Sequence, residues 1–171
     1  AGAIGPDIGY FFKYALPDLE LILVDVREEA LDFAKNRIES YVQKAQSLKK
    51  LSDDAARAVG SRILYTTDYS DIGSCDLIIE AVSEDLNIKN KVFADVERYT
   101  SDDAIITSNT SAIPAKRLFS ELKNKRRATV THFFAPAWRN EVVEVIDWKE
   151  ADKDVINYLS WMFCNLGKVP F

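Results

Sequence analysis

The chain has 171 residues, of which 47% are hydrophobic and 29% charged, so it can form a folded core and is not intrinsically disordered. The formal net charge of −5 argues against a nucleic-acid-binding surface, and no apolar run reaches membrane-spanning length. Two cysteines, Cys75 and Cys164, provide no disulfide framework. We expect both to be buried thiols in a protein of the reducing cytoplasm.

Apolar runs alternate with amphipathic stretches along the chain. Short, mostly apolar runs predict strands at 21–25, 63–67, 76–82, 104–108, 128–134 and 141–146. Helical spacing or helix-prone composition predicts helices at 7–15, 28–48, 49–61, 87–99, 114–122 and 152–166. This alternation predicts an α/β fold, a doubly wound, mostly parallel sheet with helices on both faces. We expect residues 1–171 to form one domain.

Glycines near the start of the chain resemble the end of a dinucleotide-binding turn. Gly2 and Gly5 fit the last two glycines of a G-x-G-x-x-G motif, which lets the backbone approach a pyrophosphate at a helix N-terminus. Asp25 ends the next strand, where a carboxylate binds ribose hydroxyls and repels a 2′-phosphate. The pattern favours NAD over NADP. The alternative is an ordinary strand-ending aspartate in a fold that binds no nucleotide.

Asp7 conflicts with this interpretation because it lies in the first turn of the same predicted helix. A carboxylate there suits the helix dipole, but it competes with a pyrophosphate for the positive end of the helix. We expect Asp7 to point away into solvent, because the affinity for the cofactor would otherwise suffer.

Two polar segments follow buried strands, at the edge of the sheet where ligands bind. Glu84 follows one such strand, and Lys89 comes a little more than one helical turn later. A capping turn, with Ser83 as the N-cap and acidic residues in the first turn of the helix, also explains the pattern. Capping is compatible with ligand binding. Residues 108–111 (Ser-Asn-Thr-Ser) follow another strand. Their hydroxyls suit a substrate oxygen and the Asn109 amide suits the nicotinamide ribose, although a turn and cap alone would give the same pattern.

His132 is the only histidine, and it precedes Glu144 by twelve residues in a neighbouring strand-like run. A histidine paired with a carboxylate commonly removes a proton from a substrate near neutral pH. The alternatives are a core histidine and an outward-facing glutamate on an edge strand. The pairing is favoured because each buried polar group needs a partner, and a carboxylate on one ring nitrogen fixes the tautomer. We expect no metal site.

These segments together resemble the NAD-binding domain of the 3-hydroxyacyl-CoA dehydrogenase family over essentially the whole chain. The most specific matches are Glu84–Lys89, Ser108–Ser111, His-Phe-Phe-x-Pro at 132–136 and Val143–Ile146. The resemblance implies a Rossmann-type fold. It also implies that four residues lie along the NAD pyrophosphate: Gly2, Ala3, Ile4 and Gly5. Asp25 would bind the adenosine ribose.

The resemblance implies a role for other matching residues. Three would line the nicotinamide half of the cofactor: Ala81, Glu84 and Lys89. Ser111 would hydrogen-bond the substrate's 3-oxygen, His132 would be the general base, and Glu144 would orient it. The implied reaction is the NAD-dependent oxidation of an (S)-3-hydroxyacyl-CoA to the 3-ketoacyl-CoA in fatty-acid metabolism. The implied partner is an acyl-CoA substrate, and neither nucleic acid nor a membrane is expected.

The sequence departs from the family pattern at Ala135, where the family usually has asparagine, and residues 137–140 differ from the commoner apolar sequence. We expect a piece of a longer protein, since the glycine-rich turn lacks its preceding strand and residues 167–171 resemble the start of a further segment. The family's all-helical C-terminal domain would then be absent. That domain supplies a catalytic asparagine, much of the acyl pocket and the interface of the expected homodimer.

Two alternative functions remain open at the level of sequence. One is a related hydroxy-acid dehydrogenase of the same superfamily that uses substrates without CoA. The other is a non-catalytic NAD-binding domain, which Ala135 and Asp7 favour because each departs from what turnover or cofactor binding requires.

Overall fold

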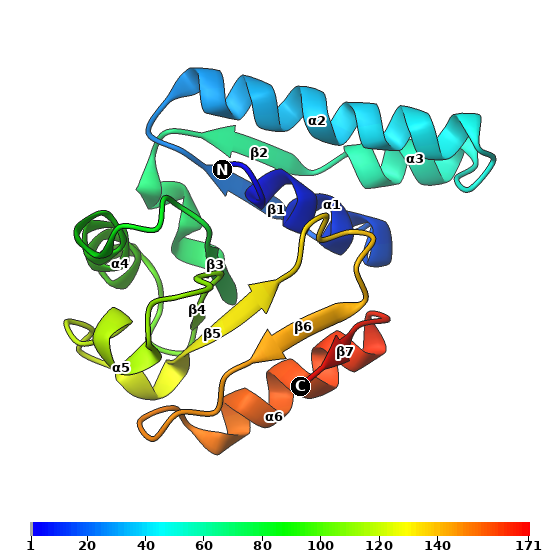
Figure 1. Cartoon of the computed structure of the whole chain (residues 1–171). Coiled ribbons are helices and arrows are strands. Elements are labelled where there is room, and N and C mark those ends of the chain that lie inside the picture. Colours follow the sequence, from blue (N-terminus) through cyan, green and yellow to red (C-terminus); the bar gives the residue numbers. More distant parts are fainter. Residues whose placement is uncertain (1) are drawn as a thin grey trace. The chain divides into compact units, whose positions relative to one another are not determined.

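The computed structural model describes residues 2–171, which form two compact units (Figure 1). Unit 1 contains the chain as far as Asp68 together with Ala135–Arg139, and unit 2 contains Tyr69–Phe134 and Asn140–Phe171. Ala1, the first residue of the predicted domain, lies outside the described residues. The helices of the described part include none that is long and apolar enough to cross a membrane.

Unit 1 is built from three helices and two parallel strands. Its elements in chain order are α1 (Gly5–Ala15), β1 (Leu21–Val24), α2 (Glu28–Ser47), α3 (Asp53–Gly60) and β2 (Ile63–Thr66). α1 has a proline in its first turn, where the missing N–H costs nothing. Ser52 caps α3 by accepting a hydrogen bond from the Ala55 amide at 3.2 Å. The predicted helices and strands of this region are confirmed to within a few residues.

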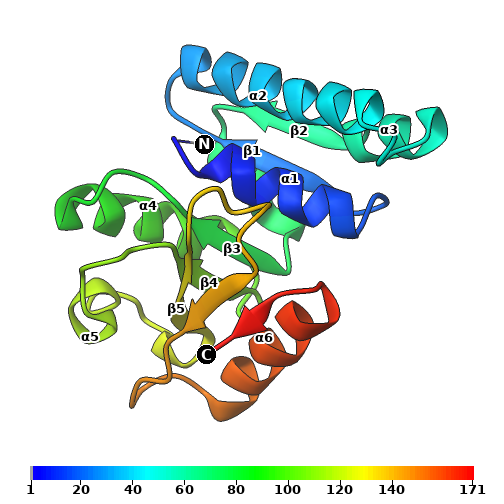
Figure 2. The same ribbon diagram turned by 45° about the vertical axis from the view of Figure 1, so that its right-hand side comes forward.

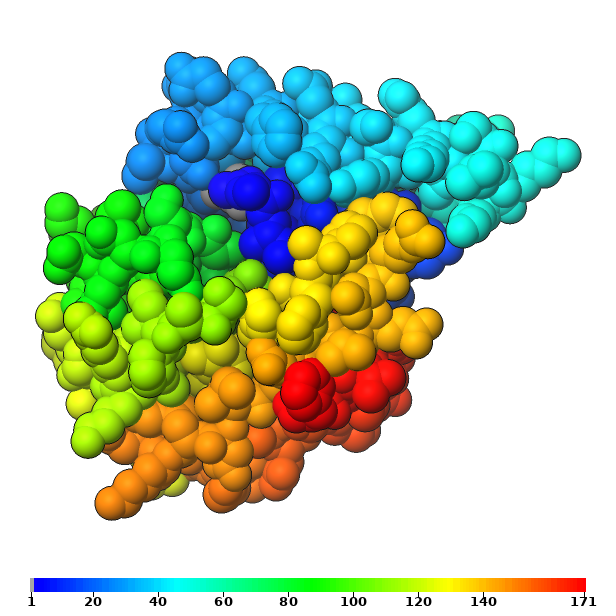
Figure 3. Space-filling view, viewed as in Figure 1, coloured from blue at the N-terminus to red at the C-terminus, as the bar shows by residue number. Residues whose placement is uncertain are grey.

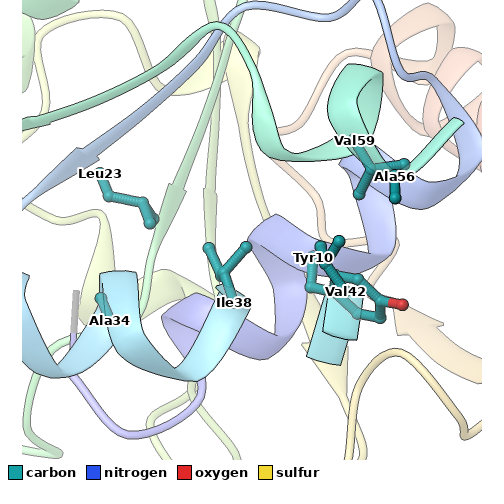
Figure 4. Close-up of a cluster of buried hydrophobic side chains, with 7 residues drawn as sticks. All are labelled: Tyr10, Leu23, Ala34, Ile38, Val42, Ala56 and Val59. Carbon is teal, nitrogen blue, oxygen red and sulfur yellow. The ribbon is translucent and has the colours of Figure 1, made fainter. Parts of the chain in front are cut away.

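The core of unit 1 forms where the apolar stripe of α2 meets α1, α3 and β1. Figure 4 shows its buried side chains, which are Tyr10, Leu23, Ala34, Ile38, Val42, Ala56 and Val59. A fully buried aliphatic side chain contributes about 1.5–3 kcal/mol. The opposite face of the α2–α3 hairpin lies at the surface, drawn blue to cyan in Figure 3.

Unit 2 is built around a five-stranded sheet with the order β3-β4-β5-β6-β7 (Figure 2). The strands are β3 (Leu77–Glu80), β4 (Ile105–Ser108), β5 (Ala128–Phe133), β6 (Val142–Val145) and β7 (Val169–Pro170). β3, β4 and β5 are parallel, β6 is antiparallel to β5, and β7 is parallel to β6. The strand β7 was not predicted, because two residues are too few to show the alternation of apolar and polar residues that indicates a strand.

Three helices and two 3₁₀ turns complete unit 2. They are α4 (Leu86–Tyr99), α5 (Ala115–Leu118), α6 (Lys153–Asn165), η1 (Tyr69–Ser74) and η2 (Lys125–Arg127). Buried hydroxyls join the three parallel strands: Thr131 donates to Thr107 at 2.8 Å, and Thr107 donates to the Ile78 carbonyl at 3.2 Å. These bonds hold the three strands together close to the carboxyl ends, from which the polar segments continue.

Three sequence predictions about unit 2 are wrong in detail. The helix predicted at 114–122 ends at Leu118, because the Ser120 hydroxyl takes the Arg117 carbonyl that a continuing helix would need. The N-cap of α4 is Asp85 instead of Ser83, since the Asp85 carboxylate accepts from the amides of Asn87 and Ile88. Cys164 is exposed on α6 and Cys75 is only partly buried, although both were expected to be buried thiols.

Candidate functional site

The carboxyl ends of β3, β4 and β5 lie side by side because the three strands are parallel. Glu80, the last residue of β3, lies opposite Ser108, the last residue of β4, and Ser108 lies opposite Val130 of β5. The segments that continue from these strands therefore begin at one edge of the sheet. Ala81 and Asn109, two predicted site residues, begin such segments, and His132 is the second-last residue of β5.

His132 and Glu144 form the predicted dyad. They are directly opposed across the antiparallel pair β5–β6, and His132 Nδ1 lies 2.6 Å from Glu144 Oε2. The side chains are partly buried, at 18% and 32% exposed. In neutral histidine, a proton on Nδ1 held by the carboxylate leaves Nε2 as the acceptor. The Phe134 ring packs beside the imidazole with centroids 4.6 Å apart, which restricts the ring further.

Asn109 links the segment after β4 to the strand that carries His132. Its side-chain oxygen accepts a hydrogen bond from the Phe133 amide at 2.8 Å. Because Phe133 follows His132 directly, this bond fixes the backbone at the end of β5. Asn109 was predicted to bind the cofactor, and the structure gives it a positioning contact instead; the cofactor contact stays a prediction.

Glu84 organises residues 110–112. Its Oε1 accepts hydrogen bonds from the Thr110 hydroxyl and from the amides of Ser111 and Ala112, the two amides lying at 3.1 Å. Its Oε2 lies 3.2 Å from the Lys89 ammonium. Burial acts to raise the pKa of Glu84, but the Thr110 and Lys89 hydrogen bonds and the lysine charge outweigh it, so the net pKa is lowered. The hydrogen bonds to Glu84 hold Ser111, which is exposed, in a defined turn.

Lys89 is not at the surface of the site. Its side chain is 1% exposed, and its ammonium lies 2.8 Å and 3.0 Å from the two carboxylate oxygens of Glu80, whose side chain is fully buried. Glu80 also accepts from the Val82 amide at 2.6 Å and from the Ser108 hydroxyl at 2.5 Å. In this arrangement Lys89 binds two carboxylates, and its expected contact with the cofactor stays a prediction.

Sequence reasoning missed Glu80, although it organises the edge of the sheet. It ends an apolar strand and precedes Lys89 by nine positions, on a different element. A buried acid at the end of a strand needs a cation, and Lys89 was the nearest candidate along the chain. The sequence therefore offered Lys89 as a candidate cation for Glu80, but the spacing alone did not show that the two side chains contact each other.

In unit 1 the glycine turn contacts the acid that follows β1, and the predicted cofactor contacts of both stay predictions. Gly2, with a positive φ of 60°, donates its amide to Asp25 Oδ2 at 3.2 Å, and the Arg27 amide donates to Oδ1 at 3.1 Å. Ala3 and Ile4 complete the turn, and the Ile4 carbonyl accepts from the amides of Asp7 and Ile8 to begin α1. A Cβ added to Gly5 would meet no atom within 4 Å. The open space beside Gly5 and the carboxylate at the end of β1 fit a dinucleotide backbone and its ribose.

The expectation that Asp7 points into solvent is wrong. Asp7 is 2% exposed, because its carboxylate binds Arg37 and Tyr41 of α2. A partner thirty residues away in the sequence outweighed the solvation that a lone carboxylate prefers. Over residues 2–171, no group of three or more potential metal ligands is brought together.

The comparison with protein families shows the family of the chain. Residues 1–171 match the model of the family described as "3-hydroxyacyl-CoA dehydrogenase, NAD binding domain". The chain belongs to this family. The family was expected from the sequence, and the match covers the same residues as the expected resemblance.

Curated relatives of this family member include much longer proteins. The chain is 33% identical over 170 residues to a "Fatty acid oxidation complex subunit alpha" of Psychrobacter sp. (strain PRwf-1), covering 99% of the chain and 23% of that protein. A protein of the same name from Idiomarina loihiensis is 30% identical, with 99% and 24% covered. The chain thus spans about a quarter of the length of these relatives.

Solved structures confirm the Rossmann-type fold. The 3-hydroxybutyryl-CoA dehydrogenase of Escherichia coli K12 matches with a TM-score of 0.93 and 29% identity, over 99% of this chain and 35% of that one. The (S)-3-hydroxybutyryl-CoA dehydrogenase of Ralstonia eutropha matches with a TM-score of 0.93 and 25% identity, over 99% and 59%. The predicted fold class is therefore confirmed.

Replacing Lys89 with methionine should destabilise this family member strongly. Loss of the ammonium leaves the Glu80 carboxylate buried without its cation, and breaking a buried pair in this way costs about 3–5 kcal/mol. The free energy of unfolding from urea titration measures the effect. The control Lys91→Met removes an exposed lysine of the same helix and should have little effect. The double variant Glu80→Gln/Lys89→Met should recover part of the loss, and equal losses in the single and double variants would contradict the ion-pair explanation.

The lowered pKa of Glu84 predicts a pH dependence of stability. The unfolded chain binds the proton at higher pH than the folded chain does, so Glu84 stabilises the fold above its usual pKa of 4.5. This stabilisation is lost as the pH falls through the lower folded pKa. Glu84→Gln should therefore reduce the acid sensitivity of the free energy of unfolding, measured at several pH values. The exposed Glu29→Gln on α2 is the matched control, and identical pH profiles of the wild type and Glu84→Gln would refute the assignment.

Proposed function

We propose that the chain is the NAD-binding domain of an enzyme that oxidises (S)-3-hydroxyacyl-CoA to 3-ketoacyl-CoA. The observation that carries the proposal is the His132–Glu144 dyad, with 2.6 Å between the ring nitrogen and the carboxylate, at the edge where three parallel strands end. The membership in the family and the dehydrogenases of similar structure support the same reaction. Acyl-CoA is accordingly the proposed substrate class.

In this proposal the residues of unit 2 handle the hydroxyl group of the substrate. His132 Nε2 takes the hydroxyl proton, while Glu144 holds Nδ1–H and stabilises the positive charge that the ring acquires. Ser111 hydrogen-bonds the 3-oxygen and is held in place by Glu84. NAD supplies the hydride acceptor for C3. In the reverse reaction, His132 returns the proton.

We assign the cofactor contacts to two sets of residues. Gly2, Ala3, Ile4 and Gly5 accommodate the pyrophosphate through their backbone, and Asp25 binds the adenosine ribose. The remaining contacts, with the nicotinamide half, are assigned to Ala81, Glu84 and Asn109. Lys89 is also assigned to the nicotinamide half, and its ammonium binds the carboxylates of Glu84 and Glu80.

The whole protein is proposed to extend beyond these residues. The length of the curated relatives supports a further domain, which we propose to be all-helical and to complete the acyl pocket and a homodimer interface. Residues 1–171 would then act as one cofactor-binding domain that is inactive alone. We propose a cytoplasmic location on the grounds of the cysteine content.

The dyad is tested in the natural protein that contains this chain. His132→Ala should lower kcat for acetoacetyl-CoA reduction with NADH by about 10²–10⁴-fold, as expected for a lost general acid–base group. Glu144→Gln should also lower kcat, whereas the exposed Glu141→Gln should not. Turnover that persists in His132→Ala would return His132 to a structural role, whereas a wild-type protein without turnover would favour the non-catalytic alternative.

The cofactor preference is tested by isothermal titration of the chain with NADH and NADPH. We expect tighter binding of NADH, because the Asp25 carboxylate accepts from ribose hydroxyls and repels a 2′-phosphate. Asp25→Ala should narrow the preference by about 1–3 kcal/mol, the value of charged hydrogen bonds. Asp32→Ala, at an exposed position of α2, is the control. Equal affinities of the wild type for both cofactors would show that Asp25 has another role.

A further inference from the structure

The carboxylate of Asp7 is buried in the first turn of α1, the helix whose N-terminus is proposed to bind the pyrophosphate. Asp7 is 2% exposed and is the third residue of the helix. A negative charge there opposes a bound phosphate, because both favour the same positive helix end. The fold therefore contains a charge that the proposed function does not use and that acts against it.

Three hydrogen bonds hold this carboxylate toward α2. Arg37 Nε lies 2.8 Å from Asp7 Oδ1, and Arg37 Nη2 lies 3.2 Å from Oδ2, so the guanidinium engages both oxygens. The Tyr41 hydroxyl donates to Oδ1 at 2.8 Å and accepts from Arg37 Nε at 2.8 Å. A guanidinium that binds both oxygens neutralises a carboxylate more effectively than a single contact does.

Arg37 is itself held in a fixed position. Its guanidinium carbon lies 5.6 Å from the centre of the Phe33 ring and 5.7 Å from the centre of the Tyr41 ring. The side chain is 33% exposed, so it is partly shielded from water. These two neighbouring rings reduce the freedom that the arginine side chain would lose on forming the ion pair.

We propose that Arg37 is a positioning residue for the cofactor: it binds Asp7 and so keeps the N-terminus of α1 able to accept the dinucleotide phosphates. The inference rests on the proposed function, since it presumes that phosphates bind at this helix. Arg37 acts through Asp7, without itself contacting the cofactor. The charge of the pair is then what matters for binding, in addition to its packing.

Titration of the chain with NADH, and with ADP as a phosphate probe that lacks the nicotinamide, tests the proposal. Arg37→Met should weaken both ligands about tenfold or more, because the Asp7 charge is no longer neutralised. Adding Asp7→Asn should restore the affinity to within about threefold of the wild type, because no charge remains to be neutralised. Arg37→Lys, which keeps the charge but loses the contact with both oxygens, should give a loss smaller than that of Arg37→Met.

The controls separate charge from folding. Arg57→Met breaks an exposed ion pair with Asp54 on α3 and should change neither affinity. Circular dichroism checks that each variant is folded; if Arg37→Met fails to fold, the comparison of Asp7→Asn with the wild type at low and high salt replaces it. In that comparison Asp7→Asn should bind at least as tightly as the wild type at both salt concentrations.

The outcomes distinguish this inference from the proposed function. Equal losses in Arg37→Met and in Asp7→Asn/Arg37→Met would show a purely structural role and overturn the inference. Weaker binding of Asp7→Asn than of the wild type would do the same. A wild-type chain that binds ADP but not NADH would contradict the proposed function alone, and the Arg37 effect would then be read from ADP. A wild-type chain that binds neither would overturn both.

Discussion

The buried ion pair between Glu80 and Lys89 is the interaction on which the polar edge of unit 2 depends. It joins the end of β3 to the first turns of α4, and the Ser108 hydroxyl extends it to the end of β4. Lys89 also contacts Glu84, which holds the turn at 110–112. Two charges taken out of water are costly unless each is fully bonded, so this cluster tolerates only one arrangement.

A second set of hydrogen bonds connects that cluster to the strand that carries the His132–Glu144 dyad. Asn109 leaves β4 next to Ser108 and binds the backbone beside His132. The hydrogen bond between the buried hydroxyls of Thr131 and Thr107 also joins β5 to β4. The position of His132, the proposed general base, is therefore supported by residues that have no proposed role in proton transfer.

The sequence predicted the elements well and the polar partnerships poorly. Apolar runs and helical spacing depend on local residues, so β1, β5 and α2 were placed within about two residues. The pair of His132 and Glu144 was predicted because a buried histidine and a buried glutamate in two neighbouring strand-like runs each need a polar partner. The partners of Asp7 and Glu80 were not predicted, since they come from other elements and no local pattern encodes the distance. β7 was not predicted because it is only two residues long and lies at the edge of the sheet.

The antiparallel register of β5 and β6 has a consequence for how this family member can vary. Side chains alternate between the faces of a strand, so a slip of one residue would turn Glu144 to the face opposite His132. Substitutions in the connection at 135–139 leave the register unchanged, and this is where the sequence departs from the family pattern. A single insertion or deletion inside β6 would break the dyad while both residues survived in an alignment. The proposed catalytic pair thus depends on the register of β5 and β6, and a shift of that register would separate the two side chains without changing either residue.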